Sequence, residues 1–249
     1  MPETPDHLIE TKVVEFQKNQ YKSPIIFGGF VGPGLVGLVT TGYMIEKLNL
    51  REIAHVQSQH IPPVVVFVGA KLRHPFRIYS DAGGTVLAMI CEMPIDMEGL
   101  YEISSVLIDY AEDVHAKEIV VLDGVPVSGV PEERKAWGVA DESRIKELEQ
   151  SGVEAISTAM ITGIGGSLLN QCLTRRISGV SLLTSVSVDI PDPGAPLELV
   201  KAINQIYNLN IGTSELEENV KRLNARLTEL AQQYSKLGEQ APGDKQLYG

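Results

Sequence analysis

Residues 24–48 read PIIFGGFVGPGLVGLVTTGYMIEKL, and this stretch predicts a β-strand that passes through a glycine-rich turn into an α-helix. The run PIIFGGF is apolar on both faces, which is typical of a strand whose sheet is covered by helices on both sides. We expect the following helix to span about residues 34–48. A strand that leads directly into a helix is the repeating unit of α/β folds.

The same alternation of short β-branched runs and helical patterns continues outward from this stretch. Further helices are predicted at about 97–116, 141–150, 165–176 and 196–207, and the other strand candidates are KVVEF, IAHVQS, VVVFV, FRIYS, TVLAMICE, EIVVLDG, AISTAMI and VSLLTSV. The hairpin-like spacing between residues 52 and 91 predicts some antiparallel pairing. We therefore expect residues 1–210 to form an α/β sandwich on a mostly parallel sheet.

Composition excludes several classes of protein. The chain has 249 residues, 43% of them hydrophobic, and a formal net charge of −11. The negative charge argues against binding to nucleic acid or an anionic membrane, because both require clustered Lys and Arg. The apolar runs are far shorter than the roughly 18 residues of a membrane helix, and the polar, acidic start MPETPDHLIE does not resemble a signal peptide. We expect a soluble, cytoplasmic protein.

The two cysteines, Cys91 and Cys172, both lie in apolar stretches. They are too few and too far apart in the sequence for a disulfide framework or a zinc site. No pair of histidines has helical ligand spacing with a partner acid. We therefore expect two buried, reduced thiols, and we predict neither a metal nor a cofactor.

Gly32, Gly34 and Gly37 match the G-x-G-x-x-G spacing of a dinucleotide-binding loop and lie between a strand and a helix, as such a loop requires. The fingerprint also needs an acidic residue at the end of the next strand, but EIAHVQSQH carries its acid at the start. Pro33 removes a backbone N–H that a pyrophosphate would use. We therefore expect a tight turn in which glycines allow backbone to pack against backbone.

A second glycine cluster, Gly163, Gly165 and Gly166, lies at another predicted helix start. The free backbone N–H groups of a helix start can bind an anion, so both clusters are possible ligand loops. Neither cluster continues with the Lys-Ser or Lys-Thr of a Walker loop.

Asp123 and Asp189 follow predicted strands, at the edge where ligands bind in open α/β sheets. Together with Asp192 and Glu98 they are candidate catalytic acids, and the alternative is that they cap turns and helices. No serine or cysteine stands in a nucleophile-elbow context. The incomplete motifs favour a binding protein, although an active site without a local signature stays open as the alternative.

After Asn210 the pattern changes to a heptad repeat. Ser214 and Glu217 have the spacing of a capping box at the start of a helix over 214–237. Its apolar positions alternate in steps of four and three: Leu216, Val220, Leu223, Leu227, Leu230, Tyr234 and Leu237. This 3.5-residue period predicts self-association through a coiled coil or helical bundle, and packing on the helix's own domain is the alternative.

The last segment, residues 238–249, is expected to be a flexible tail that ends in Leu247, Tyr248 and Gly249. An aliphatic side chain, an amphipathic ring and a terminal carboxylate suit capture by a partner protein. The nine-residue linker from Gly238 to Gln246 would span about 15–18 Å as a coil and at most about 30 Å when extended.

The segment GGFVGPGLVGLVTTGYMIEKL resembles the N-terminal motif of the archaeal and bacterial branch of the proteasome assembly chaperone family. The segments HIPPVVVF, LDGVPVSG, ITGIGGSLL and DIPDPGAPLELVKAIN follow in order and extend the resemblance over about residues 12–207. The resemblance implies a three-layer α/β/α sandwich similar to that of purine nucleoside phosphorylases, without established catalysis. It also implies homo-oligomers and leaves a family paralogue open as a second partner.

Proteasome activators related to this family dock on the core particle through a C-terminal hydrophobic residue, a tyrosine and any final residue. That motif maps onto Leu247, Tyr248 and Gly249. The resemblance therefore implies an ATP-independent activator or assembly chaperone, not an enzyme, that binds the α-subunits of the core particle. The alternative function is a small-molecule or nucleoside-processing enzyme on a phosphorylase-like scaffold.

Overall fold

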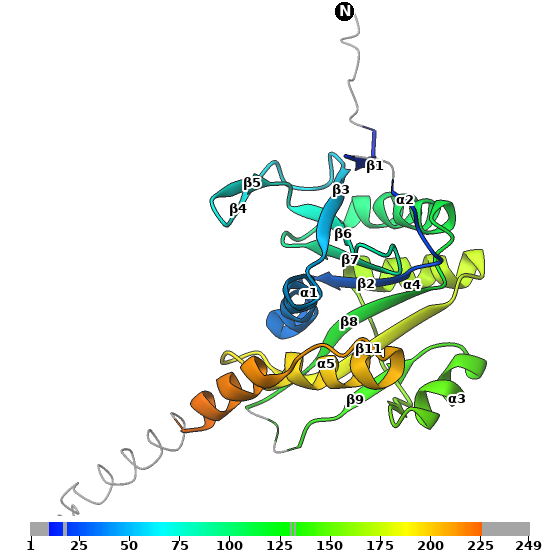
Figure 1. Cartoon of the computed structure of the whole chain (residues 1–249). Helices are drawn as coiled ribbons and strands as arrows, with labels where there is room; N and C mark the ends of the chain where they lie inside the picture. Colours follow the sequence, from blue (N-terminus) through cyan, green and yellow to red (C-terminus); the bar gives the residue numbers. More distant parts are fainter. Residues whose placement is uncertain (1–9, 17–18, 130, 132, 226–249) are drawn as a thin grey trace, which may run out of the picture.

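The structure is a computed structural model that describes residues 10–16, 19–129, 131 and 133–225 (Figure 1). Within these residues nine strands form one sheet in the order β1-β3-β6-β7-β2-β8-β11-β9-β10, and β4 and β5 form a separate hairpin. The strands are β1 (Lys12–Glu15), β2 (Ile25–Phe30), β3 (Arg51–Gln57), β4 (Val66–Val68), β5 (Lys71–Arg73), β6 (Phe76–Ser80), β7 (Val86–Cys91), β8 (Glu118–Val127), β9 (Ala136–Val139), β10 (Glu154–Ala155) and β11 (Gly179–Ser187).

The centre of the sheet is parallel, since β2 pairs with β7 and β8, and β8 pairs with β11, all in the same direction. β6 pairs antiparallel with both β3 and β7, which confirms the antiparallel pairing predicted between residues 52 and 91. On the other side, β9 pairs antiparallel with β11. The parallel centre places the carboxyl ends of β7, β2, β8 and β11 at one edge.

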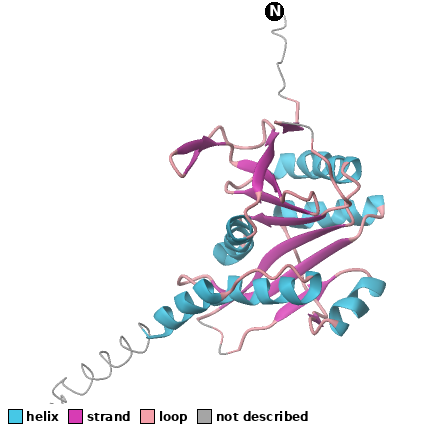
Figure 2. Ribbon diagram, viewed as in Figure 1, coloured by secondary structure: helices cyan, strands magenta, loops and turns pink. Residues whose placement is uncertain are grey.

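Helices cover both faces of the sheet (Figure 2), which gives the three-layer arrangement expected from the sequence. The bounds are α1 (Val36–Lys47), α2 (Leu100–Asp113), α3 (Glu142–Gln150), α4 (Gly163–Arg175) and α5 (Gly194–Tyr207), and residues 214–225 are also helical. α2 and α4 bury one core cluster that includes Phe76, Ile103 and Leu168. α1 and α5 bury the other, around Phe27 and Leu182. Within the described part of the chain, none of the helices has the length and apolarity to cross a bilayer.

Two strand predictions need correction. In AISTAMI only Ala155 belongs to a strand, and residues 156–162 run irregularly over the surface, where Met160 is 88% exposed. The segment VVVFV forms only β4, outside the main sheet. Short apolar runs have no periodicity that distinguishes a strand from an irregular segment. The sequence also failed to predict β5 and β9, which are only three and four residues long.

The described part of the segment after Asn210 packs on the domain. Ile211 and Leu216 are buried in the α1 and α5 core, and Val220 packs against it. The amide of Asn204 accepts from the N–H of Ile211 and donates to its carbonyl, at 2.7 and 2.8 Å. The first two heptad positions are thus used by the chain's own core, and the predicted self-association rests on the later positions.

The C-terminal helix starts one residue earlier than the predicted capping box. The N–H of Glu217 donates to the carbonyl of Thr213 at 3.0 Å, and the Thr213 hydroxyl donates to the Glu217 carboxylate at 2.8 Å. Thr213 therefore takes the cap position assigned to Ser214, because the cap carbonyl accepts the first helical bond. Leu223 is half-buried. Leu227, Leu230, Tyr234, Leu237 and the tail with Leu247, Tyr248 and Gly249 lie outside the described residues.

Candidate functional site

The structure brings the two glycine clusters together at the carboxyl edge of the parallel strands, with Asp123 between them. A Cβ at Gly32 would lie 2.6 Å from Oδ1 of Asp123, which is in the middle of β8, next to the end of the neighbouring strand β2. Asp123 also lines a small cavity with Thr162 and Gly165, at the start of α4. Segments that are more than a hundred residues apart in sequence thus meet at the edge where α/β proteins bind ligands.

The first cluster is built for close packing of α1 on the sheet. A Cβ at Gly37 would lie 2.0 Å from the carbonyl oxygen of Leu122, and a Cβ at Gly29 would lie 2.2 Å from the carbonyl oxygen of Gly37. Gly34 has φ +57°, and a Cβ there would lie 2.3 Å from Val186. The prediction of a tight turn with backbone against backbone is confirmed, because no side chain fits at these positions.

The second cluster has the same construction at the start of α4. A Cβ at Gly165 would lie 2.9 Å from Val121, and one at Gly166 would lie 2.3 Å from the carbonyl oxygen of Ile161. Gly163 has φ +65°, and a Cβ there would meet no atom within 4 Å. Glycine is favoured at this position because its backbone adopts a positive φ without the strain that other residues have. Thr162 precedes the helix without a side-chain cap hydrogen bond.

The cavity between the two loops has a volume of about 20 Å³. A volume of that order holds about one water molecule, whereas small-molecule sites usually enclose about 300–1,000 Å³. Its lining residues include Phe30, Val31 and Ile164. This cavity is therefore smaller than a nucleotide or a nucleoside.

Asp123 is the one predicted acid that the described structure places against both loops. Burial raises the pKa of its carboxyl group, and the hydrogen bond from the N–H of Gly124, at 2.8 Å, partly offsets that rise. Asp192 has a structural role, because it pairs with Arg134 and accepts from the N–H of Ser187 at 2.9 Å. Asp189 is exposed at the end of β11 and Glu98 is exposed before α2.

The same edge carries an exposed apolar surface that sequence analysis did not identify. Val31, Leu35, Val39 and Val188 are 41–55% exposed, and we call them the glycine-loop patch. Leu35 adopts a left-handed backbone with φ +54°, which costs a non-glycine residue roughly 1–2 kcal/mol. Backbone strain is typical of functional sites in general, and exposed apolar side chains gathered in one place favour contact with another protein.

A larger cavity, of about 790 Å³, lies at the amino ends of β8 and β11. Its lining includes the buried carboxylate of Glu118, which accepts two hydrogen bonds from Arg144, at 2.7 and 3.1 Å. The Ser178 hydroxyl donates to the same carboxylate at 2.9 Å. The Tyr207 hydroxyl also donates to it. Burial raises the pKa of the Tyr207 hydroxyl, with the Glu118 charge adding to the effect. Glu118 is thus fully engaged in joining α3 and α5 to the sheet.

No group of three or more His, Cys, Asp or Glu side chains within the described ranges is arranged to hold a metal ion. Both cysteines are free and buried. Cys91 and Cys172 lie in the core on the α2 and α4 side of the sheet. The arrangement at the carboxyl edge can therefore offer an apolar contact surface and one half-buried carboxyl group.

Comparisons with known proteins identify relatives over most of the chain. The model of the PAC2 family matches residues 26–231. A solved structure of a protein of unknown function from Thermoplasma acidophilum is 45% identical, covering 88% of this chain and 90% of that one, with a TM-score of 0.76.

Two structures from Pyrococcus furiosus have the same fold. PbaA, described as an archaeal homologue of proteasome-assembly chaperone, is 24% identical, with 92% of this chain and 95% of that chain covered and a TM-score of 0.81. PbaB, described as an archaeal proteasome activator, is 21% identical, with 89% and 99% covered and a TM-score of 0.78.

Proposed function

The chain belongs to the PAC2 family, and we propose that it is a proteasome-binding protein, either an ATP-independent activator or an assembly chaperone. Its fold is that of PbaA and PbaB, whose descriptions name these two roles. The observation that carries the proposal is the carboxyl edge of the sheet. There the cavity between the glycine loops has a volume of only about 20 Å³. The glycine-loop patch beside it exposes apolar side chains that a partner protein can contact.

We propose that the α-subunits of the core particle are bound through the tail, Leu247-Tyr248-Gly249. Leu247 contributes apolar burial, Tyr248 an amphipathic ring, and Gly249 leaves the terminal carboxylate free to approach a lysine. One such tail binds weakly because ordering it costs free energy. Several tails on one oligomer raise the avidity by roughly 10²–10⁴.

Self-association supplies these several tails in the proposal. Leu216 and Val220 pack on the chain's own core, so the contacts between copies fall to Leu223 and the positions from Leu227 to Leu237. A helix that is anchored to its domain at its first turns would hold the copies in a defined orientation. The domains would supplement the short heptad repeat, which is near the lower limit for a coiled coil.

The test is deletion of residues 247–249 in the full chain, with Gln246→Ala as the matched control in the same tail. We expect the deletion to abolish binding to purified archaeal core particles and stimulation of peptide cleavage, and the control to leave both unchanged. A deleted chain that binds and stimulates equally well would overturn the tail mechanism. Assembly of core particles from free subunits, measured beside activity of mature particles, separates a chaperone from an activator.

The enzyme alternative rests on one observation, the raised pKa of the half-buried Asp123 carboxyl beside the glycine loops. Calorimetric titration with nucleosides and inorganic phosphate tests it. Binding that is lost in Asp123→Asn would favour a phosphorylase-like scaffold with a ligand, and it requires the loops to open. The predicted similarity to purine nucleoside phosphorylases stays a prediction.

A further inference from the structure

The β4–β5 hairpin stands apart from the main sheet and projects from the molecule (Figure 1). β4 pairs only with β5 among the described strands. The two residues between them, Gly69 and Ala70, both have positive φ, +57° and +60°, which is the geometry of a tight type I′ turn. A two-stranded hairpin by itself is marginally stable in water, so contacts beyond its own two strands hold this arm.

The arm presents large apolar side chains to solvent. Phe67 and Leu72 lie directly opposite each other across the hairpin and are 72% and 66% exposed. Val64 and Val65, which lead into β4, are 40% and 52% exposed. Large exposed apolar side chains on a projecting element favour contact with another protein.

The base of the arm is fixed to the domain. Arg73 of β5 forms an ion pair with the buried carboxylate of Glu52 in β3. His60, just before the arm, lies 3.3 Å from the carboxylate of Glu102 in α2. The arm is therefore held in a defined direction, which lowers the entropic cost of docking on a partner.

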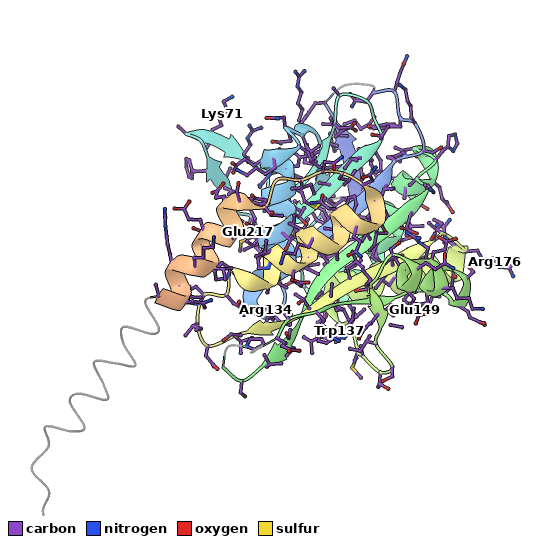
Figure 3. The ribbon with its side chains drawn as sticks, turned by 60° about the horizontal axis from the view of Figure 1, so that its bottom comes forward. Lys71, Arg134, Trp137, Glu149, Arg176 and Glu217 are labelled. Atoms are coloured by element: carbon purple, nitrogen blue, oxygen red, sulfur yellow. The ribbon has the colours of Figure 1, made fainter. Side chains whose placement is uncertain are left out.

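The arm carries no acid although the chain is acidic, and Lys71 is its exposed base, because Arg73 is paired with Glu52. Residues 53–80 contain no Asp or Glu, while the whole chain has a net charge of −11. Lys71 at the tip is exposed, and Figure 3 shows it on the projecting hairpin. An apolar and basic arm is complementary to a surface that is apolar and acidic.

The chain itself offers such a surface at the start of α2. Met97 and Tyr101 are 87% and 69% exposed, and the acids Asp96, Glu98 and Glu102 surround them in the sequence; we call these five residues the α2 patch. In the single chain the arm and the α2 patch both remain exposed, so the arm does not cover the patch of its own chain.

We propose that the arm of one copy docks on the α2 patch of a second copy. If each arm reaches the patch of the other copy, the contact closes as a two-fold dimer, and if the contacts run head-to-tail they close into a ring or extend as a filament. The proposal rests on the self-association included in the proposed function. It adds an interface that is separate from both the heptad helix and the docking tail.

The first test uses the full-length chain and sedimentation velocity over a range of concentrations. Phe67→Glu places a charge at the centre of the contact, and we expect the dissociation constant of the assembly to rise at least about tenfold, or about 1.4 kcal/mol. Leu173→Glu is the matched control, because Leu173 is 76% exposed on α4 and lies near Arg175, which pairs with Asp109 and Glu112 at the end of α2 opposite the patch. We expect it to assemble like the unmodified chain.

A charge exchange tests the partner surface. Lys71→Glu and Glu98→Lys should each weaken assembly, and the chain with both changes should assemble better than either single variant. If the Phe67→Glu chain assembles with unchanged affinity, the arm is not part of the interface. If the double variant assembles no better than the single variants, the α2 patch is not the surface that the arm contacts.

Variants of the heptad helix keep this proposal distinct from the proposed function. If Leu230→Glu dissociates the oligomer while Phe67→Glu does not, the result refutes the arm interface and supports the heptad interface. If the unmodified chain is monomeric at every concentration, self-association fails as a whole. Core-particle binding through the tail is measured separately, on immobilised core particles, and does not depend on either result.

Discussion

Replacement of Gly37 by alanine tests whether the glycine-rich turn is a packing device. In α1 a Cβ at Gly37 would lie 2.0 Å from the carbonyl oxygen and 3.0 Å from the carbonyl carbon of Leu122. Ordinary contacts begin near 3.4 Å, so the oxygen lies roughly 1.4 Å too close. Leu122 belongs to the central strand β8, whose backbone is held on both sides by β2 and β11, and α1 must therefore move away from the sheet.

The expected loss of stability follows from two opposing effects. Overpacking a core costs about 1–3 kcal/mol and occasionally more, and a contact with rigid backbone belongs at the upper end of that range. Alanine in a helix interior regains about 1 kcal/mol relative to glycine. The net loss for Gly37→Ala is about 2 kcal/mol. For a domain of this size that lowers Tm by about 4–8 °C.

Gly42→Ala is the control in the same helix. A Cβ at Gly42 would meet only Ile90, at 3.9 Å, which is an ordinary contact. This variant should gain up to about 1 kcal/mol and raise Tm by about 2–4 °C. Thermal unfolding followed by circular dichroism measures both. A Gly37→Ala protein whose Tm equals or exceeds that of the unmodified chain would refute the packing argument. It would then favour the reading of the turn as a ligand loop.

Three further outcomes are expected from the described contacts. Arg144→Ala leaves the buried Glu118 carboxylate unpaired and should reduce the free energy of unfolding by about 3–5 kcal/mol in urea titrations; an unchanged midpoint would refute the role of the pair. Burial alone would raise the pKa of Asp81, but three backbone N–H groups donate to its carboxylate and lower it. The resulting stability is present above the unfolded pKa of about 3.9 and is lost as pH falls through the folded value. Asp81→Asn should therefore weaken the loss of stability on acidification, measured by urea unfolding from about pH 6 to about pH 2. Burial raises the pKa of Cys91 to about 11 and that of Cys172 to about 12, so both thiols should react with a disulfide reagent only after unfolding; rapid reaction of the native protein would contradict their burial.

Sequence reasoning predicted the elements with strong local signals. The five helices predicted inside the domain all form. The first of them, α1, spans Val36–Lys47, and the prediction was 34–48. Antiparallel pairing between residues 52 and 91 was also predicted. These signals lie within one element, as a period of apolar residues or as the length of a connection. The strand predicted at 155–161 failed because a short apolar run carries no such period.

The candidate site was predicted only in its parts. The glycine clusters and Asp123 were each identified from their places after strands or before helices. Their meeting, the 20 Å³ cavity between them and the exposed glycine-loop patch were not, since no pattern in the sequence reports the distance between separate loops. The β4–β5 arm was missed for the same reason, because exposure of Phe67 and Leu72 depends on what the rest of the chain covers.

The sequence by itself determined the alternation of strands and helices, the turn chemistry of the glycine segments and the acidic charge, because each of these depends on neighbouring residues or on composition. The tertiary structure alone decided that Gly37 faces the carbonyl of Leu122 and that the glycine loops form packing contacts around a closed edge. Those contacts follow from the strand order β7-β2-β8-β11, which places segments far apart in the chain side by side. Strand order results from the packing of the whole chain, so no local stretch of sequence contains it.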